Sequence, residues 1–308
     1  MTETFTLVHL SDAHLGPIAG FRLGNLNIKR AFGFLNWQRH RRFVHVPSVA
    51  ERLAADALAH APDHIAVTGD LANLGLPGEF VTGLGWLKSL GEPHRVSVVP
   101  GNHDIYTGQL GGPSCLETWA PYMRGSESWT ETSPVHFPYE RTVGQVALIG
   151  LNSSIPTPPG VAGGRVGPMQ LAALARSLER LGEAGYIRVV LIHHPPLPGQ
   201  ATARRALEDA AALADVLARH GAELVLHGHN HKQSLAWLKR GDGGGIPVLG
   251  VASASAAFGY KAEPPARYHL LRIRRADGEV FINCEVRGLD GEGHVARIAR
   301  DDLVMPSP

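Results

Sequence analysis

The sequence predicts an α/β fold, because short apolar runs alternate with helical segments along most of its 308 residues. The apolar runs are bounded by polar or turn residues and several are rich in Val or Ile, which is typical of buried strands. Alternation of such strands with helices indicates an α/β architecture. Ser48 is expected to cap the first helix, and Gly182 and Gly221 are expected to end the last two. The expected strands are 5–10, 64–67, 96–99, 146–151, 189–192 and 224–226, and the expected helices are 49–60, 79–90, 169–181 and 204–220.

The pattern changes after Ile246, where helical segments no longer separate the strands. Three consecutive strands are expected there, at 248–252, 268–273 and 280–286, which predicts an antiparallel edge of the sheet system. Two stretches rich in Pro and Gly are expected to be surface loops and not domain linkers. They are 155–168 and 241–247, so residues 1–308 are predicted to form a single domain.

The composition is that of an ordinary globular protein. Hydrophobic residues make up 44% of the chain and charged residues 19%. The 29 Lys and Arg residues nearly balance the 28 Asp and Glu residues, and the formal net charge is +1. Because a nucleic-acid binder that relies on its overall field is usually more basic, no specific nucleic-acid partner is expected. The sequence does not specify an oligomeric state.

The N-terminal segment and the cysteines favour a cytoplasmic protein. The first residues, MTETFTLVHLSD, lack the basic and apolar regions of a secretory signal. No apolar run approaches the roughly 18 residues of a membrane-spanning helix. The sequence has two cysteines, Cys115 and Cys284, which are expected to be reduced, packed thiols.

Potential metal ligands follow five of the expected strands, directly at the point where each strand ends. In open α/β sheets the carboxyl ends of the strands form the edge where ligands bind. We therefore expect side chains that are far apart in the sequence to meet at one site. The five segments are Ser11-Asp12-Ala13-His14, Thr68-Gly69-Asp70, Pro100-Gly101-Asn102-His103-Asp104, His193-His194-Pro195 and His227-Gly228-His229-Asn230-His231.

The residue types in these segments predict a metal site without a cysteine ligand. Carboxylates and neutral imidazoles bind borderline divalent metals well, and a carboxylate can bridge two cations. The pairs Asp12/His14 and His229/His231 are expected to place both side chains on one side of an extended segment. Asn102 offers a neutral carbonyl oxygen. Three glycines next to potential ligands are expected to let the backbone turn sharply: Gly69, Gly101 and Gly228.

On these motifs the sequence resembles the calcineurin-like metallophosphoesterase superfamily. The pattern of that superfamily is D-x-H, GD, GNH(D/E), H and GHxH, and this chain contains SDAH, GD, GNHD, HHPP and GHNH in the same order over roughly residues 5–255. The resemblance implies a four-layer αββα sandwich, with two mixed β-sheets flanked by helices. It also implies a hydrolase of phosphate esters that depends on two metal ions, expected to be divalent or mixed-valence Mn, Fe or Zn.

The resemblance further implies a role for each matching residue. His103 would be the catalytic residue, free of the metals and beside the substrate phosphate. Asn102 would contact the substrate as well as a metal, and His194 would either support the ligands or face the substrate. Asp104 is expected to orient neighbouring groups or to occupy a turn, and not to be a metal ligand. One ion would take Asp12, His14 and His231, the other would take Asn102, His193 and His229, and Asp70 would bridge both.

The predicted mechanism requires no covalent enzyme intermediate. A water that bridges two cations loses a proton near neutral pH, and the hydroxide would attack phosphorus opposite the leaving group. His103, as imidazolium, would stabilise the developing charge or protonate the leaving alkoxide.

The substrate is left open between two enzyme classes. The first is a phosphodiesterase of the cyclic-nucleotide or glycerophosphodiester type. The alternative is a pyrophosphatase that acts on a lipid-linked nucleotide such as UDP-diacylglucosamine. A non-catalytic binding scaffold is disfavoured, because scaffold members usually lose metal ligands and this chain keeps all of them.

The segment 21–45 mixes basic and aromatic residues and follows His14 closely, so a cap insertion at about 16–47 is expected to overhang the site. Ile28, Phe32 and Leu35 have the spacing of an amphipathic helix. In one reading the aromatic side chains pack on the body while the basic ones are solvated. In the other, the segment makes peripheral contact with a membrane or with a lipid-bearing anionic substrate. The basic residues are Arg22, Lys29, Arg30, Arg39, Arg41 and Arg42.

Overall fold

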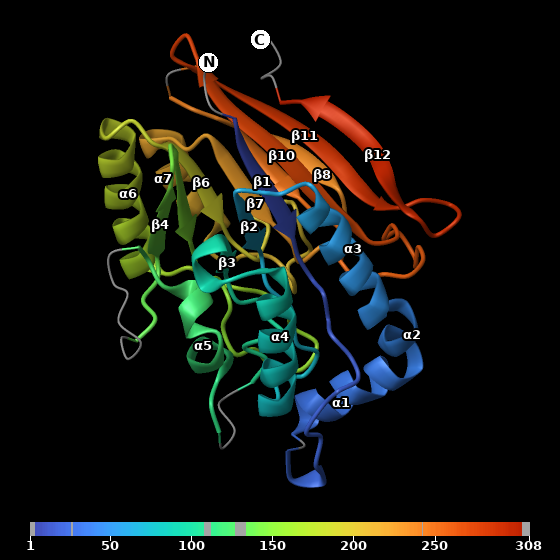
Figure 1. Cartoon of the computed structure of the whole chain (residues 1–308). Coiled ribbons are helices and arrows are strands. Elements are labelled where there is room, and N and C mark those ends of the chain that lie inside the picture. The colour runs from blue at the N-terminus through green and yellow to red at the C-terminus, as the bar shows by residue number, and fades with distance from the viewer. Residues whose placement is uncertain (1–3, 26, 108–111, 127–133, 242, 304–308) are drawn as a thin grey trace.

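The computed structural model describes residues 4–25, 27–107, 112–126, 134–241 and 243–303, and contains two six-stranded β-sheets (Figure 1). Residue 26 of the expected cap, residue 242 of an expected loop and both ends of the expected domain lie outside the described residues. The first sheet has the order β12 (Val295–Asp302), β11 (Glu279–Leu289), β10 (Arg267–Ala276), β1 (Phe5–Leu10), β2 (His64–Val67) and β3 (Val96–Val98). The second has the order β4 (Tyr139–Val143), β5 (Val146–Gly150), β6 (Ile187–Leu191), β7 (Leu224–His227), β9 (Gly245–Gly250) and β8 (Ser234–Lys239).

Both sheets are mixed. In the first, β1, β2 and β3 are parallel, whereas β10, β11 and β12 continue the sheet in antiparallel pairs from β1. In the second, β5, β6, β7 and β9 are parallel, with β4 and β8 antiparallel at the two edges. The expected antiparallel edge is confirmed for β10 and β11. It is wrong for the expected strand 248–252, because β9 is a parallel neighbour of β7 in the other sheet.

Alternation of side chains along the strands produces the layers. In β6, Val189 and Leu191 join the core that fills the space between the sheets, whereas Val190 joins a second core that includes Leu174 and Leu213 of two helices. Helices α6 (Pro168–Glu183) and α7 (Ala210–His220) cover the second sheet. Helices α3 (Pro47–Ala59) and α4 (Pro77–Leu90) pack on the first, as Figure 1 shows for α3. The predicted four-layer αββα sandwich is confirmed.

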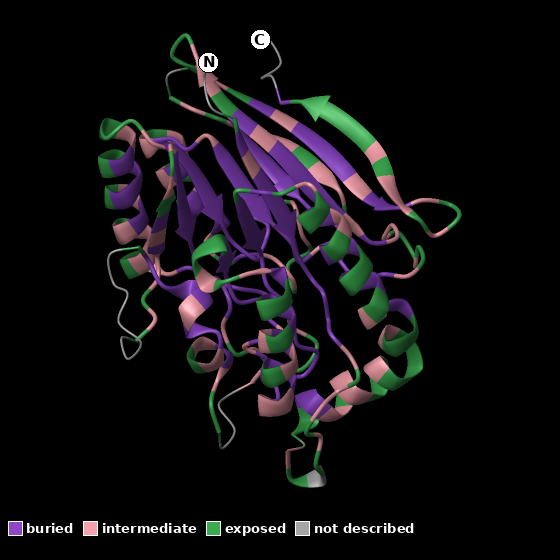
Figure 2. Ribbon diagram, viewed as in Figure 1, coloured by how far each residue is buried: buried purple, intermediate pink, exposed green. Residues whose placement is uncertain are grey.

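Three strands that the sequence analysis did not anticipate lie at sheet edges: β4, β8 and β12. An edge strand is only partly covered, so its sequence carries charged and half-exposed residues instead of an apolar run. Figure 2 shows the contrast between β12, which is largely exposed, and the buried central strands. The remaining short helices are η1 (Leu23–Asn25), α1 (Ile28–Asn36), η2 (Trp37–Arg41), α2 (Arg42–Val44), η3 (Pro93–Arg95), α5 (Cys115–Thr118) and η4 (Ala120–Met123).

Several predicted helix ends are wrong. Ser48 does not cap α3, because Pro47 already occupies the first turn and Val46 precedes it. Gly182 lies inside α6, where the absence of a Cβ atom leaves room for the Arg188 guanidinium. The expected helix 204–220 begins only at Ala210, although Gly221 follows its last residue with φ 75°, as predicted.

Other expectations from the sequence are partly confirmed. The expected loop 241–247 overlaps the start of β9 at Gly245. Cys115 and Cys284 are buried and unpaired, as expected. Within the described part of the chain, no helix combines the length and apolar character needed to cross a bilayer.

The cap helix α1 is present, but the reading in which aromatic side chains pack and basic ones are solvated holds for only part of the cap. Lys29 and Arg30 are buried, whereas Ile28 and Phe32 are 70% and 64% exposed. Arg30 donates to the carbonyl oxygens of Leu74 and Gly75, at 3.2 and 3.4 Å, and this anchors the helix to the loop after β2. The aromatic residues that do pack are Phe21, Phe34 and Trp37, whose rings stack in sequence.

Candidate metal centre

The backbone reverses direction at the strand ends where the predicted ligands lie. A positive φ is uncommon in residues other than glycine and costs of order 1–3 kcal/mol at each position. The predicted ligands with positive φ are Asp12 (54°), His14 (40°), Asp70 (55°), His229 (68°) and His231 (52°). In the described part of the chain, the other non-glycine residues with positive φ are Ala61, Lys261 and Asp277.

These φ angles show that the pairs Asp12/His14 and His229/His231 do not project from extended segments, contrary to the expectation from the sequence. They also change the role of two glycines. Gly69 has φ 91° and does form a turn, but Gly101 and Gly228 do not lie in the left-handed region. A Cβ atom on Gly101 would collide with Asp70, and one on Gly228 would collide with Ser11 and Asp12. Gly101 and Gly228 therefore allow segments to approach one another closely.

Each of the four predicted histidine ligands has one ring nitrogen engaged away from the centre. Histidine ligands of metals almost always donate their second ring N–H to a carbonyl, a carboxylate or water, which fixes the tautomer. If the outer nitrogen of each ring donates its N–H to the neighbouring oxygen, the inner nitrogen carries a lone pair. These inner nitrogens are His14 Nε2, His193 Nε2, His229 Nδ1 and His231 Nε2. The outer contacts are His14 Nδ1 to Ala72 O at 3.1 Å, His193 Nδ1 to Thr68 O at 2.7 Å, His229 Nε2 to Arg205 O at 3.0 Å and His231 Nδ1 to Glu263 Oε2 at 3.0 Å.

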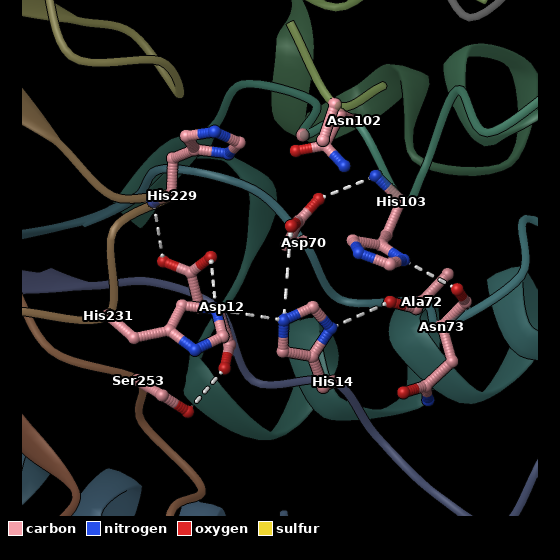
Figure 3. Close-up of polar contacts among 12 residues, drawn as sticks. Asp12, His14, Asp70, Ala72, Asn73, Asn102, His103, His229, His231 and Ser253 are labelled. Atoms are coloured by element: carbon pink, nitrogen blue, oxygen red, sulfur yellow. Dashed lines mark hydrogen bonds and ion pairs between the residues drawn. The ribbon is translucent and has the colours of Figure 1, made fainter. Parts of the chain in front are cut away.

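The free nitrogens gather in two groups around the carboxylate of Asp70. Figure 3 shows Asp70 with His14 on one side of it and Asn102 on the other. On one side, His14 Nε2 is 3.2 Å from His231 Nε2, which is 3.2 Å from Asp12 Oδ1. The distance from His14 Nε2 to Asp70 Oδ2 is 3.9 Å.

On the other side of Asp70, His193 Nε2 lies 3.4 Å from Asp70 Oδ2, 3.2 Å from Asn102 Oδ1 and 3.2 Å from His229 Nδ1. The structure thus brings all seven predicted ligands together in the two predicted sets. Their assignment as metal ligands stays a prediction.

The electrostatics of the centre fit cations. Asp12 and Asp70 are buried, at 0% and 2% exposed. Burial lowers the pKa of His193 and of His231, but the charges of Asp70 and Asp12, respectively, outweigh it and raise both pKa values to about 9. Two buried carboxylates therefore hold protons on the imidazoles that face them. Because metals bind neutral imidazole, cations that enter this centre would replace those protons.

His103, the predicted catalytic residue, lies against the centre and contacts Asp70, Asn73 and Arg41. Its backbone N–H donates to Asp70 Oδ1 at 2.7 Å, and its Nδ1 lies 2.6 Å from the carbonyl oxygen of Asn73. Its Nε2 lies 2.9 Å from Nη1 of Arg41. Burial, and next the Arg41 charge, lower the pKa of His103 to about 3. The guanidinium of Arg41 therefore carries the positive charge here, and the expected imidazolium is not favoured.

Both ring nitrogens of His194 contact protein oxygens and not the centre. The side chain is fully buried, its Nδ1 lies 2.8 Å from Ser153 Oγ and its Nε2 lies 3.2 Å from Ala162 O. Its ring packs against that of His229, with centroids 4.5 Å apart. Of the two roles that the sequence left open for His194, the geometry favours support over substrate contact.

Asp104 ties two ligand-bearing turns together, as expected of an orienting residue. Its buried carboxylate accepts hydrogen bonds from the backbone N–H groups of Asp70, Ala72 and Gly101 at 2.8, 2.9 and 2.8 Å. Burial, and next the charge of Asp70, raise the pKa of Asp104 to about 7. The turn that carries Asp70 is thereby held against the turn that carries Asn102.

Several residues at the centre have no strand-end signal in the sequence. Arg41 and His45 come from the cap, and Glu263 and Arg205 come from loops, where Arg205 donates to the carbonyl oxygen of His229 at 2.5 Å. Arg41 belongs to the basic segment that the sequence singled out, but nothing in its spacing distinguishes it from Arg39 or Arg42.

Comparison with known proteins identifies the family. The sequence model of the calcineurin-like phosphoesterases matches residues 5–233, which include every predicted ligand. This chain belongs to that family. It is therefore a metal-dependent hydrolase of phosphoric esters, and the family works with two metal ions.

One related protein and two solved structures are similar to this chain. The glycerophosphodiester phosphodiesterase GpdQ of Enterobacter lignolyticus (strain SCF1) is 26% identical over 232 residues, which are 74% of this chain and 72% of that protein. A dimetal phosphatase from Danio rerio has a similar structure, with a TM-score of 0.57, 13% identity and coverage of 96% of this chain and 98% of that one. Purple acid phosphatase PPD1 from yellow lupin seeds gives a TM-score of 0.55 and 13% identity over 96% of this chain and 53% of that one. At these identities the two structures show the fold alone.

Replacing Asp104 with Asn should weaken metal binding without removing a predicted ligand. The amide of Asn has a single acceptor oxygen, so the side chain can no longer accept all three backbone hydrogen bonds. Its NH₂ group would then face at least one of the three backbone N–H groups. Outer partners of ligands typically contribute about 10–100-fold to metal affinity, and we expect a loss in that range by calorimetric titration with Mn²⁺. Asp301→Asn, on the exposed strand β12, is the matched control and should bind as wild type. Unchanged affinity in a folded Asp104→Asn protein would contradict the positioning role.

Proposed function

We propose that this chain is a phosphodiesterase for small diesters, of the glycerophosphodiester or cyclic-nucleotide type. The observation that carries the proposal is the convergence of four imidazoles, each with one free nitrogen, on Asp12 and the shared carboxylate of Asp70. The relative GpdQ is described as a glycerophosphodiester phosphodiesterase, which supports a diester over a monoester.

The predicted ligands divide into two sets that share Asp70. Asp12, His14 and His231 would hold one ion, and Asn102, His193 and His229 would hold the other. When bound, the two ions supply Lewis acidity and activate a water molecule for attack on phosphorus. The donor set of carboxylate, amide oxygen and imidazole suits Mn, Fe or Zn.

Arg41 and His103 would divide the two roles that the sequence assigned to His103 alone. The guanidinium of Arg41 is a permanent charge beside His103 and would neutralise a nonbridging phosphate oxygen. His103, held by Asn73 O and by Asp70, is neutral before substrate binds, so it would first have to take up a proton, which the negative charge of a bound phosphate favours, and then deliver that proton to the leaving oxygen. The pair would thus bind the phosphate next to the centre and assist departure of the alcohol.

A panel of esters tests the proposal directly. The purified protein, reconstituted with Mn²⁺, should hold roughly two ions per chain and hydrolyse glycerophosphocholine or 3′,5′-cyclic AMP faster than the matching monoesters. Asp70→Ala should lose both ions, because this carboxylate alone faces both ligand sets. Saturation at one ion per chain, or faster turnover of monoesters, would overturn the proposal.

His103→Ala should separate substrates by their leaving group. We expect kcat/KM to fall by roughly 10²–10⁴-fold for glycerophosphocholine, whose alkoxide needs a proton, and much less for bis-nitrophenyl phosphate. Arg41→Gln should slow both substrates by the same factor, because it removes charge and no proton donor. Both variants should keep the metal content of wild type. Parallel losses in His103→Ala would leave His103 with no role as a proton donor.

The surface of the cap favours a second substrate class, a lipid-bearing phosphate ester. Helix α1 presents Ile28, Phe32 and Leu35 to solvent at 70%, 64% and 44% exposure. Arg39 and Arg42 are exposed on the following turns. Apolar side chains next to arginines on one face are suited to a lipid surface of negative charge, as for the alternative substrate UDP-diacylglucosamine.

Removing Arg39 and Arg42 tests this second class. Each arginine near an anionic surface contributes about 1 kcal/mol, so Arg39→Ser/Arg42→Ser should bind phosphatidylserine vesicles roughly thirtyfold more weakly at low salt. Arg41 is left intact, because its contact with His103 would confuse binding with catalysis. The control Arg176→Ser/Arg219→Ser removes two exposed charges from α6 and α7 and should bind as wild type. Wild-type protein that ignores these vesicles would rule out lipid contact through the cap.

A further inference from the structure

His45, which lies outside all five motifs, contacts the group of residues predicted to hold one ion. It is 5% exposed, and its ring centroid lies 4.8 Å from that of His14 and 5.4 Å from that of His231. The potential ligand atoms of these three histidines lie within 4.8 Å of one another. The site therefore contains one more imidazole than the motifs require.

The backbone around His45 is fixed to the body of the protein. His45 forms an isolated antiparallel bridge with Ala256. Val46 N–H donates to Ser255 O at 2.9 Å, and Ala257 N–H donates to Val44 O at 2.8 Å. These bonds hold His45 against the segment that precedes β10, so its position does not depend on the exposed turns of the cap.

A chain of hydrogen bonds orients the ring and determines which nitrogen is free. His45 Nδ1 lies 2.9 Å from Ser255 Oγ, which lies 3.3 Å from Ser253 Oγ. Ser253 Oγ donates to the carbonyl oxygen of Asp12 at 2.7 Å, because a carbonyl can only accept. If each hydroxyl donates one hydrogen bond and accepts one, Ser255 Oγ donates to Ser253 Oγ and accepts from His45. The chain of hydrogen bonds therefore begins at the Nδ1–H of His45. Its Nε2 then carries a lone pair, and in the part of the chain that the structure describes no hydrogen-bond partner faces that atom.

This arrangement repeats the pattern of the four predicted histidine ligands. In each of them an outer nitrogen is bonded to a protein oxygen and the inner nitrogen faces the centre. In His45 the outer bonds end at the backbone of Asp12, itself a predicted ligand of the same ion. Orienting partners of this kind are what a metal-binding histidine requires.

We propose that His45 Nε2 is a further protein ligand of the ion that Asp12, His14 and His231 hold. The inference rests on the proposed two-ion centre and makes its two sites unequal. The first ion gains a third imidazole without additional charge, whereas the second keeps two imidazoles and the oxygen of Asn102. A third nitrogen donor favours zinc or iron over magnesium at the first site and gives it the higher affinity.

Titration of the metal-free protein with Zn²⁺ tests the inequality. Loss of a ligand should reduce metal affinity at least as much as loss of a hydrogen-bond partner of a ligand, which is typically about 10–100-fold. His45→Gln should therefore weaken the tighter of the two zinc-binding steps by at least that factor and leave the other step unchanged. His40→Gln, on the exposed face of the same segment, is the matched control and should leave both steps unchanged. Thermal melting of the metal-free variants establishes that they are folded. Two unchanged steps in folded His45→Gln would overturn the proposal.

Anomalous diffraction from zinc-loaded wild-type crystals gives an answer that depends on no variant. We expect a zinc ion about 2.0–2.1 Å from His45 Nε2, the distance of a zinc–imidazole bond. Zinc bound by Asp12, His14 and His231 but well beyond that distance from His45 would overturn this inference and leave the two-ion centre intact. Failure of zinc, manganese and iron alike to bind at either ligand set would overturn both.

Discussion

The buried carboxylate of Asp70 is the group on which the rest of the centre depends. It lies at the carboxyl end of β2 in one sheet and contacts His193, which follows β6 in the other. A second buried carboxylate, Asp12, lies in the same space, and burying such charges without compensation costs several kcal/mol per ion. The packing of the two sheets therefore brings together two negative charges, which the protonated rings of His193 and His231 neutralise in the metal-free protein. The neighbouring histidines that supply free nitrogens, and the backbone reversals that aim them, serve that neutralisation.

The sequence predicted the position of a residue of the centre correctly wherever that residue directly follows a buried strand. The apolar runs before Asp12, Asp70 and His193 are short and clear, and the strands that contain them have their expected positions within a few residues. The backbone conformation of the ligands could not be predicted, because a positive φ in Asp or His leaves no signature in residue spacing. The roles of Gly101 and Gly228 were mistaken for the same reason: clearance between two segments becomes visible only once both are placed.

The rest of the site was hidden because it comes from segments whose patterns are mixed. Arg41 and His45 lie in the cap, where alternating basic and aromatic residues fit either a solvated or a buried face. The structure shows that α1 buries Lys29 and Arg30 while it exposes Ile28 and Phe32. Lys29 donates to Thr157 Oγ1 at 2.6 Å, and burial lowers the pKa of Lys29 to about 8. Arg41, 2.9 Å from His103 Nε2, is the cap residue that brings positive charge to the centre, a function that residue composition alone does not distinguish from solubility.

The topology of the first sheet also governs the order in which the molecule can assemble. Strand β1 lies between β10 and β2, so Phe5 pairs with Ile273 across almost the whole length of the chain. Likewise Asp12 and His14 emerge from the ribosome long before His229 and His231. A nascent chain therefore cannot close either the sheet or the ion site until synthesis is well into its last third. Contacts this distant in sequence make folding slow, and they postpone metal capture until the protein that will use the metal is nearly complete.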